Sequence, residues 1–306
     1  MDKNKLLFGA ILFVCLLPAF ISVHSAPQDP DSRLHIIVFG AHPDDCELKV
    51  GGMAARWAKE GHHVKFVSVT NGDIGHAEMA GGPLAMRRTA EVRKAAEVLG
   101  ITSEVLDIHD GELMPTLENR RTFVRLIREW KADIAIGHRP NDYHPDHRYT
   151  GILMQDAAFM VTVKFFCPDV PNLTRNPVFL YMSDNFQKPN PFDPAIVAPI
   201  DDVFDQKVKA IWEIESQIES LWATGDFEKV VPVPKEPLER EKRYQGQVER
   251  MAKRDGAVAE KYRPKLMELF GKQTGGMVRY AEAFELCEYG RRPTQEELKK
   301  LFLIDE

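Results

Sequence analysis

Cysteine is scarce in this chain, and no stretch of it concentrates basic residues. The 306 residues include only four cysteines. Without Cys15, which lies in the apolar N-terminal segment, three remain, and these cannot all pair, so the chain is no disulfide scaffold. The formal net charge is −6, so nothing favours a nucleic-acid surface, and we expect no nucleic-acid partner. Internal repeats and low-complexity tracts are absent as well. The remaining composition, 44% hydrophobic and 28% charged residues, is typical of a soluble globular protein.

Several catalytic signatures are also missing. The turn after the first predicted strand lacks G-x-G-x-x-G, which argues against a dinucleotide cofactor. The patterns H-E-x-x-H, G-x-S-x-G and C-x-x-C do not occur, which excludes three common hydrolase and dithiol arrangements. Any catalytic site must therefore combine residues that are distant in the sequence.

The N-terminal segment differs from the rest. Lys3 and Lys5 precede an apolar, uncharged run, and the small residues of HSAP follow it. A basic end, an apolar centre and a small-residue exit predict a secretory signal peptide over residues 1–25, with cleavage near Ser25 or Ala26. The alternative is a retained membrane anchor, but the run is short and contains Pro18. We therefore expect a secreted or periplasmic protein, without stable membrane insertion after cleavage.

Strand-like and helix-like segments alternate from residue 33 to about 222. Short apolar runs such as HIIVFG at 35–40 and PVFLYM at 177–182 indicate strands that are buried on both faces. Segments with helical spacing separate the strands, and one of them stops at Gly100. This alternation predicts a three-layer α/β/α fold, Rossmann-like, with a mostly parallel sheet.

Beyond Pro189 the pattern changes. The proline-rich residues 188–202 indicate connecting chain, and residues 203–222 have the spacing of one amphipathic helix. From 223 to 306 the sequence is polar and helix-like, without the apolar runs that a separate core requires. We expect a C-terminal helical extension that packs on the α/β core through its most apolar stretch, at 277–290, and helps to wall the substrate groove.

Polar residues gather just after the predicted strands. In open parallel sheets, ligands bind beyond the carboxyl ends of the strands. The candidates at these ends are His42, Asp44, Asp45, Asn71, Asp73, His109, Asp110, His144, Asp146 and His147. We therefore expect loops that are far apart in the sequence to meet in one site at this rim.

Two motifs at the rim, HPDD and HPDH, favour a divalent metal. Zinc binds imidazole nitrogen and carboxylate oxygen, and a catalytic zinc keeps one position for water. His42, Asp45 and His147 would form a site with two histidines and one carboxylate. Asp44 would then remain unbound beside the metal, where it could accept a proton from the water. The alternative for HPDD alone is a helix cap.

These motifs resemble those of the PIG-L/LmbE-like family of zinc-dependent N-deacetylases. The family patterns A-H-P-D-D-E and H-x-D-H appear here as AHPDDCE and HPDH. The segments VTNGD, RRTAEVRKAAEVLGI, DGEL and a helix with ESQ extend the resemblance over residues 33–222, which implies an LmbE-like deacetylase domain there. Cys46 occupies the usual glutamate position, and Glu47 follows it, so either residue is a candidate for that place.

The resemblance implies a role for the residues of both motifs. His42, Asp45 and His147 match the metal ligands, with Zn²⁺ as the expected ion and Fe²⁺ as the alternative. Asp44 matches the general base. His144 matches the residue that stabilises the tetrahedral oxyanion or helps to protonate the leaving amine.

Three further residues receive roles in the same way. Asp146 would orient and tune a histidine. Arg88 matches a substrate-contacting arginine in an R-x-x-E helix motif, although an ion pair with Glu91 is the alternative. Asp110 is a second substrate candidate, which could instead simply start a turn.

Together these features predict a metal-dependent hydrolase that removes an N-acetyl group from an amino sugar or glycoconjugate. The metal would polarise the amide carbonyl, and acetate and a free amine would be the products. Two alternatives stay open: a different amide, such as an acylated peptide or antibiotic, and a carbohydrate-binding protein with a structural metal. The expected partner is a small-molecule or glycan substrate. We expect His109 and His138, which lie near the rim, to be structural.

Overall fold

The structure is a computed structural model, which describes residues 33–220 and 229–304. The predicted signal peptide at 1–25 lies outside the described residues. Among the residues described, no helix combines the length and the apolar character needed to cross a bilayer.

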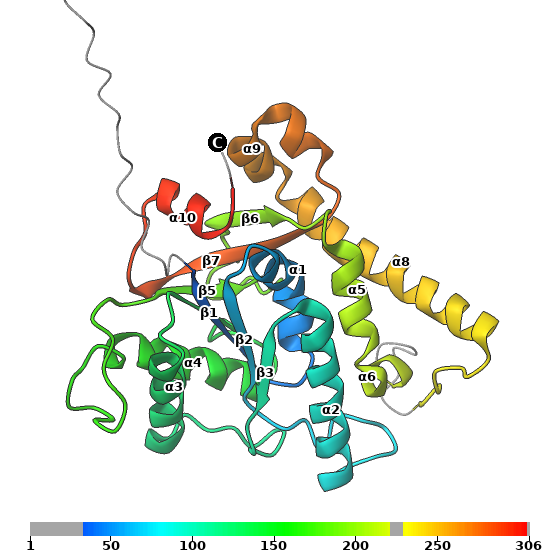
Figure 1. The fold of residues 1–306 in the computed structure, drawn as a ribbon, viewed down its shortest axis with the longest axis horizontal. Coiled ribbons are helices and arrows are strands. Elements are labelled where there is room, and N and C mark those ends of the chain that lie inside the picture. Colours follow the sequence, from blue (N-terminus) through cyan, green and yellow to red (C-terminus); the bar gives the residue numbers. More distant parts are fainter. Residues whose placement is uncertain (1–32, 221–228, 305–306) are drawn as a thin grey trace, which may run out of the picture. The chain divides into compact units, whose positions relative to one another are not determined.

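A seven-stranded sheet forms the centre of the described chain, with the strand order β3-β2-β1-β4-β5-β7-β6 (Figure 1). The strands are β1 (His35–Gly40), β2 (His63–Ser68), β3 (Thr102–Val105), β4 (Ile134–Gly137), β5 (Val178–Met182), β6 (Ile196–Pro199) and β7 (Ala281–Gly290). The first five strands are parallel to one another, whereas β7 runs antiparallel to both β5 and β6. The predicted mostly parallel sheet is confirmed.

Helices cover both faces of this sheet, which confirms the three-layer fold. On one side lie α1 (Asp45–Lys59), α2 (Gly82–Leu99) and α5 (Phe204–Trp212), and on the other lie α3 (Leu117–Glu129) and α4 (Pro145–Met160). Successive residues of β1 point to opposite faces: Ile36 and Val38 enter the first core, Ile37 and Phe39 the second. All four side chains are fully buried, so β1 lies at the centre of the fold.

Local signals set the helix ends that shape the rim. Gly100 follows α2 with φ 74°, a left-handed conformation that glycine adopts without strain, so the predicted stop is confirmed. Thr116 begins α3 by accepting a hydrogen bond from the backbone N–H of Asn119. His144 begins α4 in the same way, with Pro145 in the first turn. The HPDH motif therefore starts a helix at the carboxyl end of β4.

Residues 281–290 correct the sequence analysis. We expected a helical C-terminal extension, but β7 is a strand between β5 and β6, so the C-terminal part completes the sheet. The expectation was wrong for these ten residues, in which Glu282, Glu285 and Glu288 recur every three residues, as on a helix face. Helices at 237–277 and 295–301 confirm the helical character expected for the rest of the described extension. In the strand, Glu282 is buried and makes an ion pair with Lys207, while Glu288 is exposed.

Two more corrections concern residues 188–220. The proline-rich residues 188–202 are not only connecting chain, because they contain the edge strand β6, which ends at Pro199. The single helix predicted at 203–222 is two helices, α5 and α6 (Glu215–Glu219). The break falls at Ile214, which leaves helical geometry and is fully buried. This turn directs α6 toward the carboxyl rim of the sheet.

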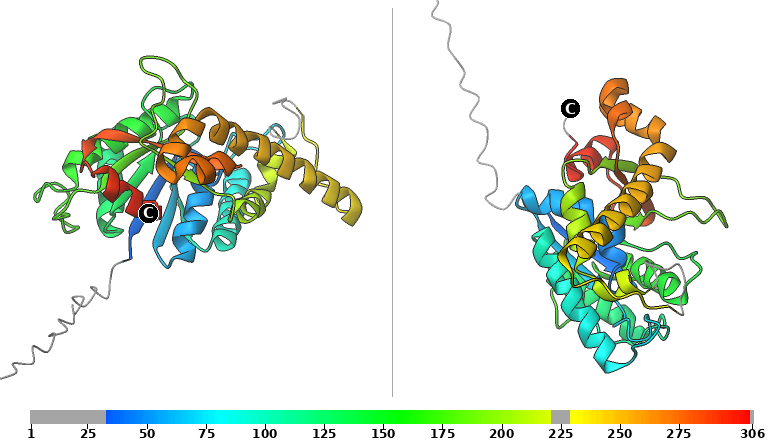
Figure 2. Two further views of the ribbon diagram at one scale, coloured as in Figure 1. Left: turned by 90° about the horizontal axis from the view of Figure 1, so that it is seen from above. Right: turned by 90° about the vertical axis from the view of Figure 1, so that its right-hand side faces the viewer.

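The C-terminal helices are α8 (Pro237–Lys261), α9 (Arg263–Met277) and α10 (Gln295–Leu301). Met251 of α8 packs in a cluster with Phe204 and Val208 of α5 and with Leu48 of α1. Figures 1 and 2 show the N-terminal half of α8 extending past α5, while its C-terminal half lies near the sheet. The C-terminal half of α8 therefore reaches the first turns of α1, where the HPDD motif ends.

Candidate metal centre and active site

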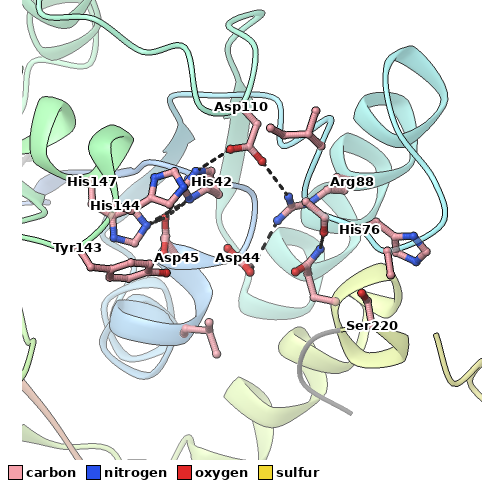
Figure 3. Close-up of a pocket in the computed structure, with 15 residues that line it drawn as sticks. His42, Asp44, Asp45, His76, Arg88, Asp110, Tyr143, His144, His147 and Ser220 are labelled. Atoms are coloured by element: carbon pink, nitrogen blue, oxygen red, sulfur yellow. Dashed lines mark hydrogen bonds and ion pairs between the residues drawn. The ribbon is translucent and has the colours of Figure 1, made fainter. Parts of the chain in front are cut away.

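A cavity of about 470 Å³ opens at the carboxyl ends of the parallel strands, as the strand-end residues predicted. The residues that line it are His42, Asp44, Asp45, Leu48, Ile74, Gly75, His76, Ala77, Arg88, Asp110, Tyr143, His144, His147, Gln217 and Ser220 (Figure 3). None of these comes from residues 229–304. The expectation that the C-terminal extension walls this cavity is therefore wrong for that part of the chain.

Three polar atoms face one another at one side of the cavity. Nδ1 of His42 lies 3.2 Å from Nε2 of His147, and both nitrogens lie 3.4 Å from Oδ2 of Asp45. In a tetrahedral site with metal–ligand distances of about 2.0–2.1 Å, neighbouring ligand atoms are about 3.3–3.4 Å apart. The three atoms thus have the spacing of three corners around a zinc-sized ion.

The outer ring nitrogens of both histidines face carboxylates. Nε2 of His42 lies 3.0 Å from Oδ1 of Asp110 and 3.3 Å from Oδ2 of Asp146. Nδ1 of His147 lies 3.1 Å from Oδ2 of Asp142. An N–H at each outer nitrogen can donate to its carboxylate, which leaves the inner nitrogen with a lone pair for a metal. The donor set therefore fits a divalent cation.

The electrostatics of this cluster also favour a cation. Burial lowers the pKa of His42, but the hydrogen bonds to Asp110, Asp146 and Asp45 outweigh this, so the pKa stands well above its usual value. Burial raises the pKa of Asp45, yet the charge of His147 and of other histidines holds it well below the usual range. Protons and a metal ion compete for the same lone pairs, so a metal can replace the protons that this field attracts.

Asp44 is not the helix cap that the sequence left open. It precedes α1, but its side chain makes no capping hydrogen bond. Its carboxylate instead lies 3.7 Å from Nη2 of Arg88 and lines the cavity (Figure 3). Burial raises the pKa of Asp44 to about 6, against the opposing charge of Arg88. A carboxylate with a pKa near neutrality has the basicity of a general base.

His144 presents an N–H donor to the same cavity. Its Nδ1 accepts a hydrogen bond from the backbone N–H of Asp146 at 3.2 Å, so the proton of the neutral ring is on Nε2. The ring meets that of His42 edge-on, with centroids 4.5 Å apart. Asp146 itself is fully buried and accepts backbone hydrogen bonds from Gly111 and Leu113. These bonds hold its carboxylate against His42, and its role in orienting that histidine stays a prediction.

Arg88 lies on the opposite side of Asp44 from the histidines (Figure 3). Its guanidinium donates to the backbone carbonyl oxygens of Gly72 and Pro43, and only 2% of the residue is exposed. The alternative of an ion pair with Glu91 is wrong, because Glu91 binds Arg87 at 3.0 Å instead. Arg88 does line the cavity, and its contact with a substrate stays a prediction.

Asp110 reaches the cavity from the loop after β3. One of its oxygens contacts His42, and the other lies 4.0 Å from Nη1 of Arg88. The residue therefore links a candidate metal ligand to the arginine beside Asp44. A substrate contact by Asp110 stays a prediction, and a role as a mere turn residue does not describe these contacts.

Two residues of this cluster were not predicted from the sequence. Asp142 contacts the outer nitrogen of His147. Its position as a polar residue in the loop after β4 was the signal in the sequence that could have identified it. His138, which we expected to be structural, stacks on His147 with centroids 4.0 Å apart, and its Nε2 lies 3.3 Å from Asp45. Asp45, His138 and His147 form one of the groups close enough to share an ion. Burial lowers the pKa of His138 to about 4, so this ring is neutral at physiological pH.

His109 behaves as expected. Its side chain is 70% exposed and makes a 2.7 Å contact with Asp73. It lies outside the residues that line the cavity.

Neither Cys46 nor Glu47 is among the residues that line the cavity. Cys46 is 1% exposed, and its Sγ lies 3.6 Å from the carbonyl oxygen of Val38, so it is packed, as expected. Glu47 is also buried, and its Oε2 has no hydrogen-bond partner. Burial raises the pKa of Glu47 to about 8. Neither residue contacts the three-atom cluster directly, so neither supplies a candidate metal ligand.

Comparison with known proteins places these residues in a family context. The PIG-L family, described as GlcNAc-PI de-N-acetylase, matches residues 37–158, a range that includes all the predicted site residues. A diacetylchitobiose deacetylase of Thermococcus kodakarensis is 30% identical over 203 residues, covering 61% of this chain and 72% of that protein. A 4-oxalmesaconate hydratase of Pseudomonas putida is 26% identical over 194 residues, covering 61% of this chain and 74% of that protein.

Solved structures share the fold. The N,N'-diacetylchitobiose deacetylase from Pyrococcus horikoshii aligns with a TM-score of 0.60 and 22% identity, covering 82% of this chain and 83% of that chain. A 4-carboxy-2-hydroxymuconate hydratase from Pseudomonas putida aligns with a TM-score of 0.63 and 20% identity, covering 85% and 96%. Relatives with different reactions therefore share this architecture. On its motifs and the extent of its similarity to the Thermococcus deacetylase, the chain belongs to the PIG-L family.

Proposed function

We propose that this protein is a metal-dependent N-deacetylase that hydrolyses the N-acetyl amide of an amino sugar or glycoconjugate. The observation that carries the proposal is the triangle of His42 Nδ1, His147 Nε2 and Asp45 Oδ2, with Asp44 beside it at the cavity wall. The deacetylase relatives support the same reaction class. Zn²⁺ is the expected ion, and Fe²⁺ is the alternative for the same ligands.

His42, Asp45 and His147 would hold the metal, which when bound supplies a Lewis acid and lowers the pKa of water. Asp44 accepts the proton of the attacking water, for which its pKa of about 6 is suited. The Nε2–H of His144 donates to the oxygen of the amide carbonyl as negative charge develops there.

The supporting residues act by position. Asp146 and Asp110 fix the ring of His42, and Asp142 fixes that of His147. Without these carboxylates either ring could turn its lone pair away from the metal position. We infer that they hold both ligands in the orientation that metal binding needs.

The carbohydrate-binding alternative explains less of the site. A structural zinc site is normally closed by four protein ligands, and a binding protein has no need of a carboxylate with the basicity of Asp44. A hydratase, as one relative is named, would also need a base. The products therefore separate the two reactions, because only a deacetylase releases acetate and a free amine.

The test is a deacetylation screen over N-acetylated sugars and glycans, with the protein supplied with Zn²⁺ or with Fe²⁺ under anaerobic conditions. We expect acetate and free amine to appear in equal amounts and to disappear when a chelator removes the metal. Acylated peptides and glycopeptide antibiotics belong in the same screen, since they represent the other amides. Turnover of none of these amides by a metal-loaded protein would contradict the proposal.

A further inference from the structure

A second cavity of about 280 Å³ adjoins the metal-site cavity and shares Tyr143 and His147 with it. Lys49 of α1 and the loop that follows β5, at residues 183–186, form much of its wall. A substrate held at the metal site by its N-acetyl group could therefore extend past Tyr143 into this second space. The charged side chains around that space therefore indicate which chemical groups the substrate carries there.

Lys49 carries an ammonium group without a carboxylate partner among the described residues. Its Nζ donates one hydrogen bond, to the backbone carbonyl oxygen of Ser183 at 2.6 Å. An ammonium has three donors, so two remain available. The acidic residues of this cavity are engaged elsewhere, since Asp142 contacts His147 and Asp184 contacts Arg139 at 3.1 Å.

Arg254 of α8 is not among the residues that line this cavity, but it lies close enough to Lys49 for its charge to lower the pKa of that lysine. Met251 and Lys261 share one face of the helix with Arg254, because Met251 comes three residues before it and Lys261 seven residues after it. Met251 packs in a cluster with Leu48, the neighbour of Lys49, and Nζ of Lys261 lies 3.3 Å from Oδ1 of Asn185. Arg254 is therefore held between α1 and the 183–186 loop, the two walls of the cavity.

The charge of Arg254 acts on both cavities. Burial lowers the pKa of Lys49 to about 8, and the charge of Arg254 contributes to this. Burial also lowers the pKa of Arg254, while the charges of Asp255, Asp44 and Asp45 oppose that effect. Asp255 itself binds Lys207 at 2.8 Å. Within residues 33–220 and 229–304, the Arg254 guanidinium has neither a hydrogen bond nor an ion pair.

We propose that Lys49 and Arg254 form an anion subsite that binds a carboxylate or phosphate group of the substrate next to its N-acetyl group. Two neighbouring cations without a carboxylate partner repel each other, and an oxyanion between them would remove that repulsion through charge-assisted hydrogen bonds. This inference rests on the proposed function and narrows it. The substrate is then an acidic N-acetylated glycan or sugar phosphate, and not a neutral oligomer.

The experiment compares substrates that differ only in the anionic group. One pair is N-acetylglucosamine 6-phosphate with N-acetylglucosamine, and the other is a disaccharide of N-acetylglucosamine and glucuronic acid with N,N'-diacetylchitobiose. We expect kcat/KM to be about 10- to 100-fold higher for the anionic member of at least one pair, the range for hydrogen bonds to charged groups. The pair that shows the preference identifies phosphate or carboxylate as the anion.

Arg254→Gln and Lys49→Gln should each reduce this preference at least about tenfold. Lys253→Gln is the matched control, because it removes the same charge from the exposed side of α8 and should leave the preference unchanged. Thermal unfolding of each variant checks that the fold is retained. Equal kcat/KM for both members of each pair, or a preference that survives both cavity variants, would overturn the proposal.

Binding measurements separate this inference from the proposed reaction. Two metal-loaded proteins are compared, the Asp44→Asn variant and the Asp44→Asn/Arg254→Gln double variant. Isothermal titration calorimetry measures the affinity of each protein for the four compounds in the absence of turnover. Tighter binding of an anionic compound that depends on Arg254 would support the subsite even if no acetate is ever released. Acetate release without any anion preference would leave the deacetylase proposal standing and refute the subsite.

Discussion

Asp142 and Asp146 lie four positions apart, yet each supports a different histidine. Asp142 contacts the outer nitrogen of His147, and Asp146 contacts that of His42. Asp45 then faces the inner nitrogens of both rings. At the scale of single residues, we propose that these carboxylates decide which nitrogen of each imidazole is free to bind a metal.

Replacing Asp44 by asparagine tests the general base. The amide cannot accept the proton of water, so kcat should fall by about 10²–10⁴-fold. Metal content should remain that of the wild type, because the three ligand candidates are unchanged. Elemental analysis alongside steady-state kinetics measures both, and near-normal turnover of the metal-loaded variant would disprove the role.

Asp142→Asn tests the support of His147. Losing the carboxylate weakens the preference for the tautomer whose Nε2 is free, so metal affinity should drop by about 10–100-fold. Competition with a chromophoric chelator measures the affinity. Asp169→Asn is the control, because that side chain is 53% exposed in a surface pair with Arg125. Equal affinity in the two variants would show that Asp142 has no such function.

At the scale of elements, a buried ionic cluster ties four segments together. Lys207 of α5 lies 2.8 Å from Asp255 of α8 and 2.9 Å from Glu282 of β7. The Glu282 carboxylate also accepts hydrogen bonds from the backbone N–H groups of Gly52 and Met53 in α1, both at 2.8 Å. This cluster fixes the C-terminal half of α8 and the strand β7 against the helix that begins with the HPDD motif.

Lys207→Met should lower the free energy of unfolding by about 3–5 kcal/mol, because it leaves two buried carboxylates without a cation. Urea denaturation followed by circular dichroism measures the change. Lys209→Met removes a lysine from the exposed side of the same helix, and it should have an effect of about 0.5 kcal/mol or less. A loss for Lys207→Met no greater than that of the control would mean that the cluster adds nothing to stability.

At the scale of the whole molecule, the C-terminal part belongs to the domain. β7 lies between β5 and β6 and pairs with both. Wherever the chain were divided between α6 and β7, the sheet would lose the strand that joins its edge to the parallel part. Residues 33–222 therefore contain the motifs but do not contain the complete sheet.

A variant truncated after residue 222 should fail to fold. The truncation removes β7, which exposes the edge of β5 and leaves β6 without its partner. Unpaired strand edges favour aggregation. Size-exclusion chromatography and thermal unfolding of the truncated and complete chains give the measurement. A monomeric truncated protein with a cooperative transition would show that the extension is dispensable.

We propose that residues 1–25 direct export and are then removed. Expression of the full chain in a bacterial host should yield a periplasmic or secreted protein that begins near Ala26, as read by mass spectrometry of the intact protein. A chain that starts at Ala26 should remain in the cytoplasm. Recovery of the full-length chain in the membrane fraction would instead favour the retained anchor.

The sequence by itself determined the features that depend on neighbouring residues. The apolar run at 35–40 and the glycine stop at Gly100 are local patterns, and the structure has both of them. The parallel sheet followed from the alternation of strands and helices, which placed HPDD and HPDH at one rim. The convergence of His42, Asp45 and His147 could be predicted for this reason.

Only the tertiary structure decided which distant groups meet. The strand pairing of residues 281–290, the support of His147 by Asp142 and the place of His138 beside Asp45 each join segments that loops bring together. A local pattern predicts whether a segment is a strand or a helix. It does not predict which strand pairs with it in the sheet or which side chain contacts a given histidine in the cavity. Those partners are set by packing and by the burial of charge, which depend on the whole folded chain.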